Sequence, residues 1–63
     1  MTYEAKMYSQ IAKADSFNDK DHRKYQAYKL AATYAAKCES ITNKAALVID
    51  LTTKSKAAYA AYI

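Results

Sequence analysis

Residues 19–41 read DKDHRKYQAYKLAATYAAKCESI, and this stretch decides the fold. It contains neither Gly nor Pro, the two residues that most readily interrupt a helix. Its apolar residues recur at three- and four-residue steps, so at about 100° per residue they form one stripe along a helix. The members of this stripe are Ala27, Leu30, Ala31, Tyr34, Cys38 and Ile41. The stretch is therefore predicted to form an amphipathic helix.

A second apolar set lies beside that stripe and consists of Tyr25, Tyr28, Ala32, Ala35 and Ala36. Together the two sets cover roughly two-thirds of the helix circumference, whereas a helix buried on one side needs an arc of about 100°. Such a helix requires partners on two sides. The remaining arc is expected to face water, and it carries His22, Gln26, Lys29, Thr33, Lys37, Ser40 and Lys44.

A shorter helical pattern precedes this stretch. Residues 1–15 are predicted to form a first helix, with Thr2 as its N-cap. Its apolar face carries Tyr3, Met7, Ile11 and Ala14. The pattern breaks at residues 16–19, where Ser16 and Asp19 have the spacing of a capping box for the next helix.

A second and weaker break lies at residues 40–43, where Thr42 or Asn43 could cap a third helix. The apolar face of that helix would carry Leu47, Val48, Leu51, Ser55, Ala58, Tyr59 and Tyr62. Without a break, the residues spaced seven positions apart from Tyr34 to Tyr62 would suit one long coiled-coil-like helix. These residues are Tyr34, Ile41, Val48, Ser55 and Tyr62. Both interpretations are all-α. We favour a small three-helix bundle forming a single helical domain over residues 1–63, with a short helix plus one long helix as the alternative.

The small core predicts self-association. Hydrophobic residues make up 52% of the 63-residue chain, but Ala and Tyr supply most of them. Ala buries little area and the Tyr hydroxyl needs a partner, so the core of a monomer would be marginal. A lone cysteine can form no disulfide within the chain. We therefore expect a homo-oligomer, a dimer or larger, whose interface is formed by Leu30, Ala32, Tyr34, Ala35, Ala36 and Ile41.

The sequence offers little chemistry for catalysis. With no Gly it has no phosphate-cradling loop of the usual kind, and its carboxylates form no isolated pair suited to acid–base work. One Cys and one His give no zinc pattern. We expect neither an enzyme nor a bound metal or cofactor. The chain also shows no targeting signal and no apolar run long enough to span a bilayer, which favours a cytoplasmic protein without a membrane partner.

The unusual feature is the coupling of tyrosine with cations. Seven Tyr occur in the chain, and several lie near Lys or Arg, as in Lys56 and Tyr59 three residues on. Aromatic faces stack on bases and cations neutralise phosphates. The predicted ligand-binding residues are Arg23, Lys24, Tyr25, Tyr28 and Lys29. A structural explanation also exists, because Tyr fills space in an Ala-rich bundle and a net charge of +4 is small for a nucleic-acid binder.

These features predict a small regulatory or binding protein without catalytic activity. Its homo-oligomer would present a Lys-, Arg- and Tyr-lined surface to an anionic ligand such as a nucleotide or nucleic acid. The alternative is a protein–protein interaction module, a small inhibitor or adaptor that lays the apolar helix face of residues 19–41 into the groove of a partner protein.

Overall fold

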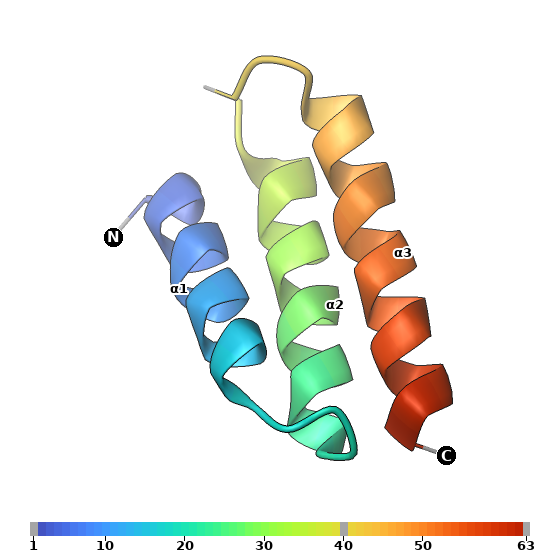
Figure 1. Ribbon diagram of the computed structural model, residues 1–63. Coiled ribbons are helices and arrows are strands. Elements are labelled where there is room, and N and C mark those ends of the chain that lie inside the picture. Colours follow the sequence, from blue (N-terminus) through green and yellow to red (C-terminus); the bar gives the residue numbers. More distant parts are fainter. Residues whose placement is uncertain (1, 40, 63) are drawn as a thin grey trace.

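The computed structural model describes residues 2–39 and 41–62, and this part of the chain contains three helices and no strand. The helices are α1 (Tyr3–Ser16), α2 (His22–Lys37) and α3 (Lys44–Tyr62), and consecutive helices run antiparallel (Figure 1). The prediction of an all-α fold with three helices is confirmed. The alternative of one long helix in place of α2 and α3 is wrong, because α2 ends at Lys37 and α3 begins only at Lys44.

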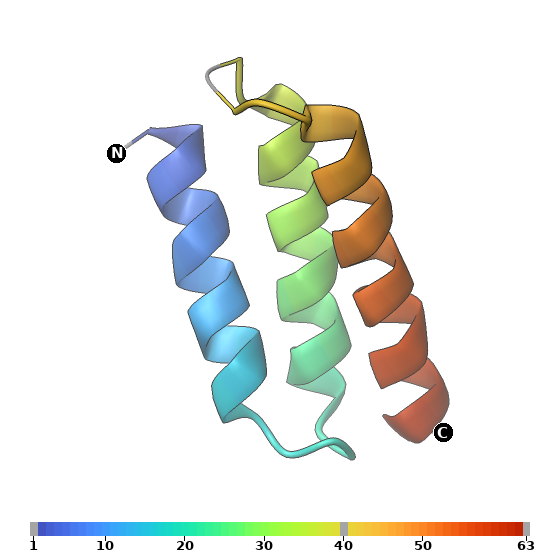
Figure 2. The same ribbon diagram turned by 45° about the horizontal axis from the view of Figure 1, so that its top comes forward.

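The three helices form an open layer with α2 in the middle, as two views of the ribbon show (Figures 1 and 2). Helices α1 and α3 both pack against α2, while their own Cα atoms stay more than 8 Å apart. The Cα trace measures 34 × 21 × 12 Å, so the molecule is thin in one direction. The expectation that the central helix needs partners on two sides is therefore confirmed.

The helix ends follow from local hydrogen bonds. Thr2 is the N-cap of α1, as predicted, and its Oγ1 accepts from the Ala5 backbone N–H at 3.1 Å. The capping box expected at Ser16 and Asp19 is wrong. Ser16 is the last residue of α1, and its hydroxyl donates to the Lys13 carbonyl. The N-cap of α2 is Asp21, which accepts from a backbone N–H in the first turn of that helix.

Asn43 directly precedes α3 and has a φ of 60°, a left-handed conformation that Asn adopts more readily than most residues. Its carbonyl accepts a hydrogen bond from the Leu47 N–H at 3.1 Å. The predicted break before the third helix therefore ends at Asn43. Ser40, expected on the water-facing arc, lies outside the described residues.

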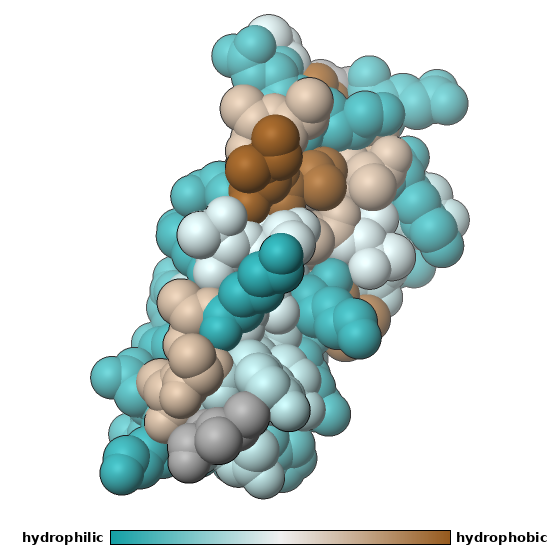
Figure 3. All heavy atoms as spheres, turned by 90° about the vertical axis from the view of Figure 1, so that its right-hand side faces the viewer, coloured by the Kyte–Doolittle hydropathy of each residue, from teal (hydrophilic) through white to brown (hydrophobic). Residues whose placement is uncertain are grey.

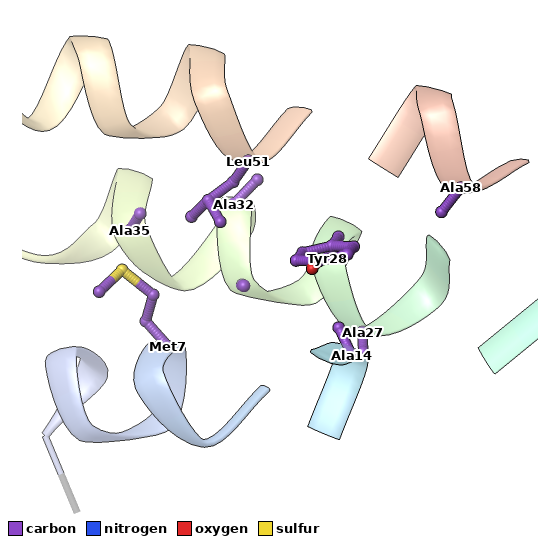
Figure 4. Packing of buried hydrophobic residues seen from close by; sticks show 9 residues of the cluster. Met7, Ala14, Ala27, Tyr28, Ala32, Ala35, Leu51 and Ala58 are labelled. Atoms are coloured by element: carbon purple, nitrogen blue, oxygen red, sulfur yellow. The ribbon is translucent and has the colours of Figure 1, made fainter. Parts of the chain in front are cut away.

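The core pairs two large side chains with many small ones (Figure 4). Met7 of α1 and Leu51 of α3 are fully buried, and they meet a surface of α2 built from alanines. The alanines let both neighbouring helices approach α2 closely, and the larger side chains fill the space above them. The buried residues of this cluster are Met7, Ala14, Ala27, Tyr28, Ala31, Ala32, Ala35, Leu51 and Ala58.

One residue of the predicted stripe is placed wrongly. Leu30 is 45% exposed, whereas Ala27 and Ala31 in the same stripe are buried. The physical reason is that α1 and α3 bring their own large side chains to α2, so alanines rather than Leu30 face them. On the arc expected to face water, the five members within α2 are exposed, and Lys44 is half-buried at the start of α3.

Candidate anion-binding site

Helix α2 carries the excess charge of the chain. It contains four Lys or Arg residues and no Asp or Glu. The other six cations of the sequence are matched in number by its six acidic residues, so the formal net charge of +4 equals that of α2. An anionic ligand would therefore be drawn to this helix, provided that its cations are not already paired within the chain.

Arg23, a predicted ligand-binding residue, is engaged by the chain itself. Its Nε and Nη2 donate to the two carboxylate oxygens of Asp21, at 3.1 and 2.7 Å, and its guanidinium lies 4.7 Å from the centroid of the Phe17 ring. The side-chain hydrogen bonds from Arg23 lower the pKa of Asp21 to about 2. Asp21 also accepts from the Arg23 backbone N–H, so the N-terminus of α2 is occupied by its own cap.

Lys24 is compensated in the same region. Its Nζ lies 3.3 Å from a carboxylate oxygen of Asp19 and donates to the Phe17 carbonyl at 3.4 Å. Its side chain is mostly covered, with 19% exposed. Arg23 and Lys24 thus both face carboxylates that precede α2. This end of α2 is not where a ligand phosphate would find unpaired positive charge.

Tyr28 has a structural role. It is buried, and its hydroxyl donates to the carboxylate of Asp15, which joins α2 to α1. Burial, and then the hydrogen bond to Asp15, raise the pKa of Tyr28 from 10.0 to about 12. Its ring packs in the core cluster, so it offers no free face for a ligand (Figure 4).

The remaining two predicted residues, Tyr25 and Lys29, meet α3 across a groove of about 390 Å³. We call this the Tyr–Lys groove; it is lined by Tyr25, Lys29, Ser55, Lys56 and Tyr59. The rings of Tyr25 and Tyr59 pack edge to face with centroids 4.9 Å apart. The Ser55 hydroxyl donates to the Tyr25 carbonyl at 3.0 Å, which fixes the two helices against each other here.

No described residue forms an ion pair with the cations of the Tyr–Lys groove. These cations are Lys29 and Lys56, and the five lining residues include no carboxylate. Sequence reasoning placed Lys29 and Tyr25 in the site but left out Ser55, Lys56 and Tyr59. The signal that was available for α3 is the pairing of Lys56 with Tyr59 three residues on, one helical turn apart.

Two other hollows are less suited to anions. One, of about 360 Å³, contains Lys24 and Lys54, but Asp19 and Asp50 pair with them at 3.3 and 3.6 Å. The other, of about 400 Å³ at the start of α1, contains Lys37 together with Glu4 and Glu39. In each of them carboxylates offset the positive charge. Among the three hollows the Tyr–Lys groove alone has a lining of cations without acids.

A second group of tyrosines and lysines lies at the other end of α2. We call it the Tyr3 cluster; it consists of Tyr3, Lys6, Tyr34 and Lys37. The rings of Tyr3 and Tyr34 stack with centroids 6.1 Å apart. The Nζ atoms of Lys6 and Lys37 lie 5.5 and 5.8 Å from the centroid of the Tyr3 ring. Cations from α1 and α2 therefore gather around one aromatic ring.

The predicted oligomer interface does not form one exposed surface. Ala32 and Ala35 are buried within the chain, Tyr34 and Ile41 are half-buried, and Leu30 and Ala36 are exposed. The chain exposes 4275 Å². This is close to the roughly 4,100 Å² that the area scaling gives for a compact 7.1 kDa monomer. The exposed area thus does not by itself require a second copy, and self-association stays a prediction.

The outer side of α3 carries an exposed apolar patch (Figure 3). Figure 3 shows strongly hydrophobic atoms gathered over the first half of this helix, with hydrophilic side chains around them. Ile49, at 66% exposed, is the most exposed large hydrophobic residue in the described part of the chain. A few exposed apolar side chains are normal on a monomer.

Comparison with known proteins found no matching family model, no matching curated protein and no matching solved structure. Among the described residues, no three His, Cys, Asp or Glu side chains lie close enough together to hold a metal ion. None of the described helices combines the length and hydrophobicity needed to cross a membrane. The Tyr–Lys groove and the charges around it are the features of the molecule best suited to binding a ligand.

Proposed function

We propose that the protein binds a phosphate-bearing anionic ligand, a nucleotide or nucleic acid, in the Tyr–Lys groove, and that it acts by binding rather than by catalysis. The observation that carries this proposal is the position of Lys29 and Lys56 in the same groove as the Tyr25–Tyr59 ring pair. Neither lysine has an ion-pair partner in the described part of the chain. The ammonium groups would neutralise phosphate oxygens, and the exposed part of the Tyr59 ring would pack on a base.

A homo-oligomer would strengthen such binding, because two or more grooves could hold one polyanion at once. Nucleotides and nucleic acids are found in the cytoplasm, and a single cysteine agrees with a reducing compartment, so we place the protein there. The alternative of a partner protein docked on the apolar face of residues 19–41 has less support. Helices α1 and α3 cover much of that face, including Ala31 and Ala35.

Calorimetric titration with nucleotides and short oligonucleotides tests the proposal. The test variant replaces both groove lysines, Lys29→Gln and Lys56→Gln. The matched control, Lys13→Gln with Lys20→Gln, removes the same charge from two exposed lysines outside the groove. Each charge-assisted hydrogen bond is worth about 1.5–3 kcal/mol, so the groove variant should bind at least roughly tenfold more weakly than the wild type.

The control variant should retain most of the affinity of the wild type at moderate salt. An equal loss in both double variants would mean that binding reflects only the total charge, and would contradict a site in the groove. Absence of binding by every phosphate-bearing ligand would remove the proposal altogether. Circular dichroism of the variants checks that each keeps the helix content of the wild type.

A further inference from the structure

The cations of α2 continue beyond the Tyr–Lys groove. Lys29, Thr33 and Lys37 follow one another at four-residue steps, and all three are exposed. At 1.5 Å per residue, Lys29 and Lys37 lie about 12 Å apart along the helix axis. Lys56 of α3 joins Lys29 at one end, and Lys6 of α1 joins Lys37 at the other. Lysines from all three helices therefore follow one oblique track across α2. Glu4 and Glu39 share a hollow with Lys37, so this end of the track is less positive than the Tyr–Lys groove.

Aromatic rings extend the same track in the other direction. Tyr62 lies 6.0 Å from Tyr25 and 5.9 Å from His22, measured between ring centroids. Together with the Tyr25–Tyr59 pair, these contacts carry the rings from the Tyr–Lys groove to the first residue of α2. Tyr59 and Tyr62 are 47% and 44% exposed, so part of each ring is open to a flat ligand.

We infer that the ligand is a single strand of nucleic acid lying along this track, from His22 and Tyr62 past the Tyr–Lys groove to the Tyr3 cluster. This inference rests on the proposed function and specifies its ligand. A single phosphate can pair with cations at one end only, because an ion pair needs approach to within about 4 Å. A strand carries successive phosphates and so meets both ends.

The exposed rings favour a single strand over other polyanions. Unpaired bases offer their faces for stacking on tyrosine, and this stacking depends little on sequence. In a duplex the base faces are covered by neighbouring base pairs. An anionic lipid surface has charges but no bases. We therefore expect bases to stack on Tyr59 and Tyr62 and backbone phosphates to contact the lysines of the track.

Binding of thymidine oligomers of increasing length, compared with thymidine diphosphate, tests the inference. Affinity should rise with length until the strand reaches Lys37. Lys37→Gln should weaken binding of the longer oligomers and leave the diphosphate unaffected, whereas Lys29→Gln should weaken both. Lys13→Gln is the control. For oligomers, loss of the Lys37 contact should reduce the slope of log K against log salt by about 0.7.

Tyr59→Leu keeps an apolar side chain but removes the ring, and it should weaken oligomer binding by roughly tenfold from lost stacking. The same oligomer annealed to its complement should bind more weakly than the single strand. Three results would overturn the inference while leaving the proposed function intact. These are oligomers that bind no more tightly than the diphosphate, a duplex bound as tightly as the single strand, and anionic lipid vesicles bound with the same dependence on Lys37. Failure of every phosphate ligand to bind would remove the proposed function as well.

Discussion

Replacing Leu51 by alanine removes one of the two large side chains that fill the core. Leu51 is 1% exposed and lies over the α2 surface near Ala32 (Figure 4). The neighbouring alanines cannot move into the space that the variant leaves, since their side chains end at Cβ. Leu51→Ala should therefore create a cavity that the surrounding structure closes only in part.

The expected cost is large relative to the stability of the chain. A buried Leu→Ala change lowers the free energy of unfolding by about 2–5 kcal/mol. Because the alanines around Leu51 cannot fill the space, we expect a loss of about 3–4 kcal/mol for Leu51→Ala. A chain of 63 residues has a free energy of unfolding of roughly 3–9 kcal/mol. The Tm should fall by roughly 12–30 °C, at about 4–8 °C for each kcal/mol. The variant should be partly unfolded at physiological temperature.

Thermal and urea unfolding followed by circular dichroism measure this effect, and Ile49→Ala is the matched control. Ile49 lies two residues earlier in α3 and loses the same number of carbon atoms, but it is 66% exposed. The free energy of unfolding of Ile49→Ala should differ from that of the wild type by no more than about 0.5 kcal/mol. Equal destabilisation by the two variants at low protein concentration would refute the assignment of the faces of α3.

Three further predictions concern ionisation and assembly. Burial and Asp15 raise the pKa of Tyr28 from 10.0 to about 12, so its contribution to the free energy of unfolding is complete below pH 10.0 and is lost as the pH rises through about 12. Urea unfolding at successive pH values should show this loss of stability, and the loss should be smaller in Tyr28→Phe. The pKa of Asp21 is lowered from 3.8 to about 2, so its contribution to the free energy of unfolding is complete above pH 3.8 and is lost as the pH falls through about 2. NMR titration should show the pKa of Asp21 returning toward 3.8 in Arg23→Gln. Sedimentation should give a mass of at least twice 7.1 kDa, with a Tm that rises with concentration. Leu30→Asp should keep the helix content and lower that mass, whereas a monomer with a concentration-independent Tm would contradict self-association.

The helices were predictable because their signals are local. Apolar residues at helical spacing and the N-cap at Thr2 depend only on neighbours in the sequence, as does the wide apolar arc of α2. The choice of cap before α2 was harder. Ser16 and Asp21 are both good cap residues, and the choice between them depends on where α1 ends and how the short connection turns.

The errors lie where tertiary packing decides. Leu30 belongs to a regular stripe, but its burial depends on whether the neighbouring helices leave room for it, and Met7 and Leu51 fill that room instead. The site shows the same limit. The sequence located Lys29, but its partner Lys56 is 27 positions away, and only the antiparallel alignment of α2 with α3 brings the two into one groove.

The arrangement of α2 between two helices whose described Cα atoms stay more than 8 Å apart has a consequence for folding. Among the described residues, close Cα approaches between helices join only neighbours in the sequence, so the contact order is low and folding is expected to be fast. Each outer helix can detach while the other pair stays docked, so hydrogen exchange should be slowest in the amides of α2 and faster in those of α1. Fraying of α1 would remove Lys6 and Tyr3 from the track and leave the groove between α2 and α3 assembled. The molecule can thus lose part of its structure by local unfolding without losing the groove.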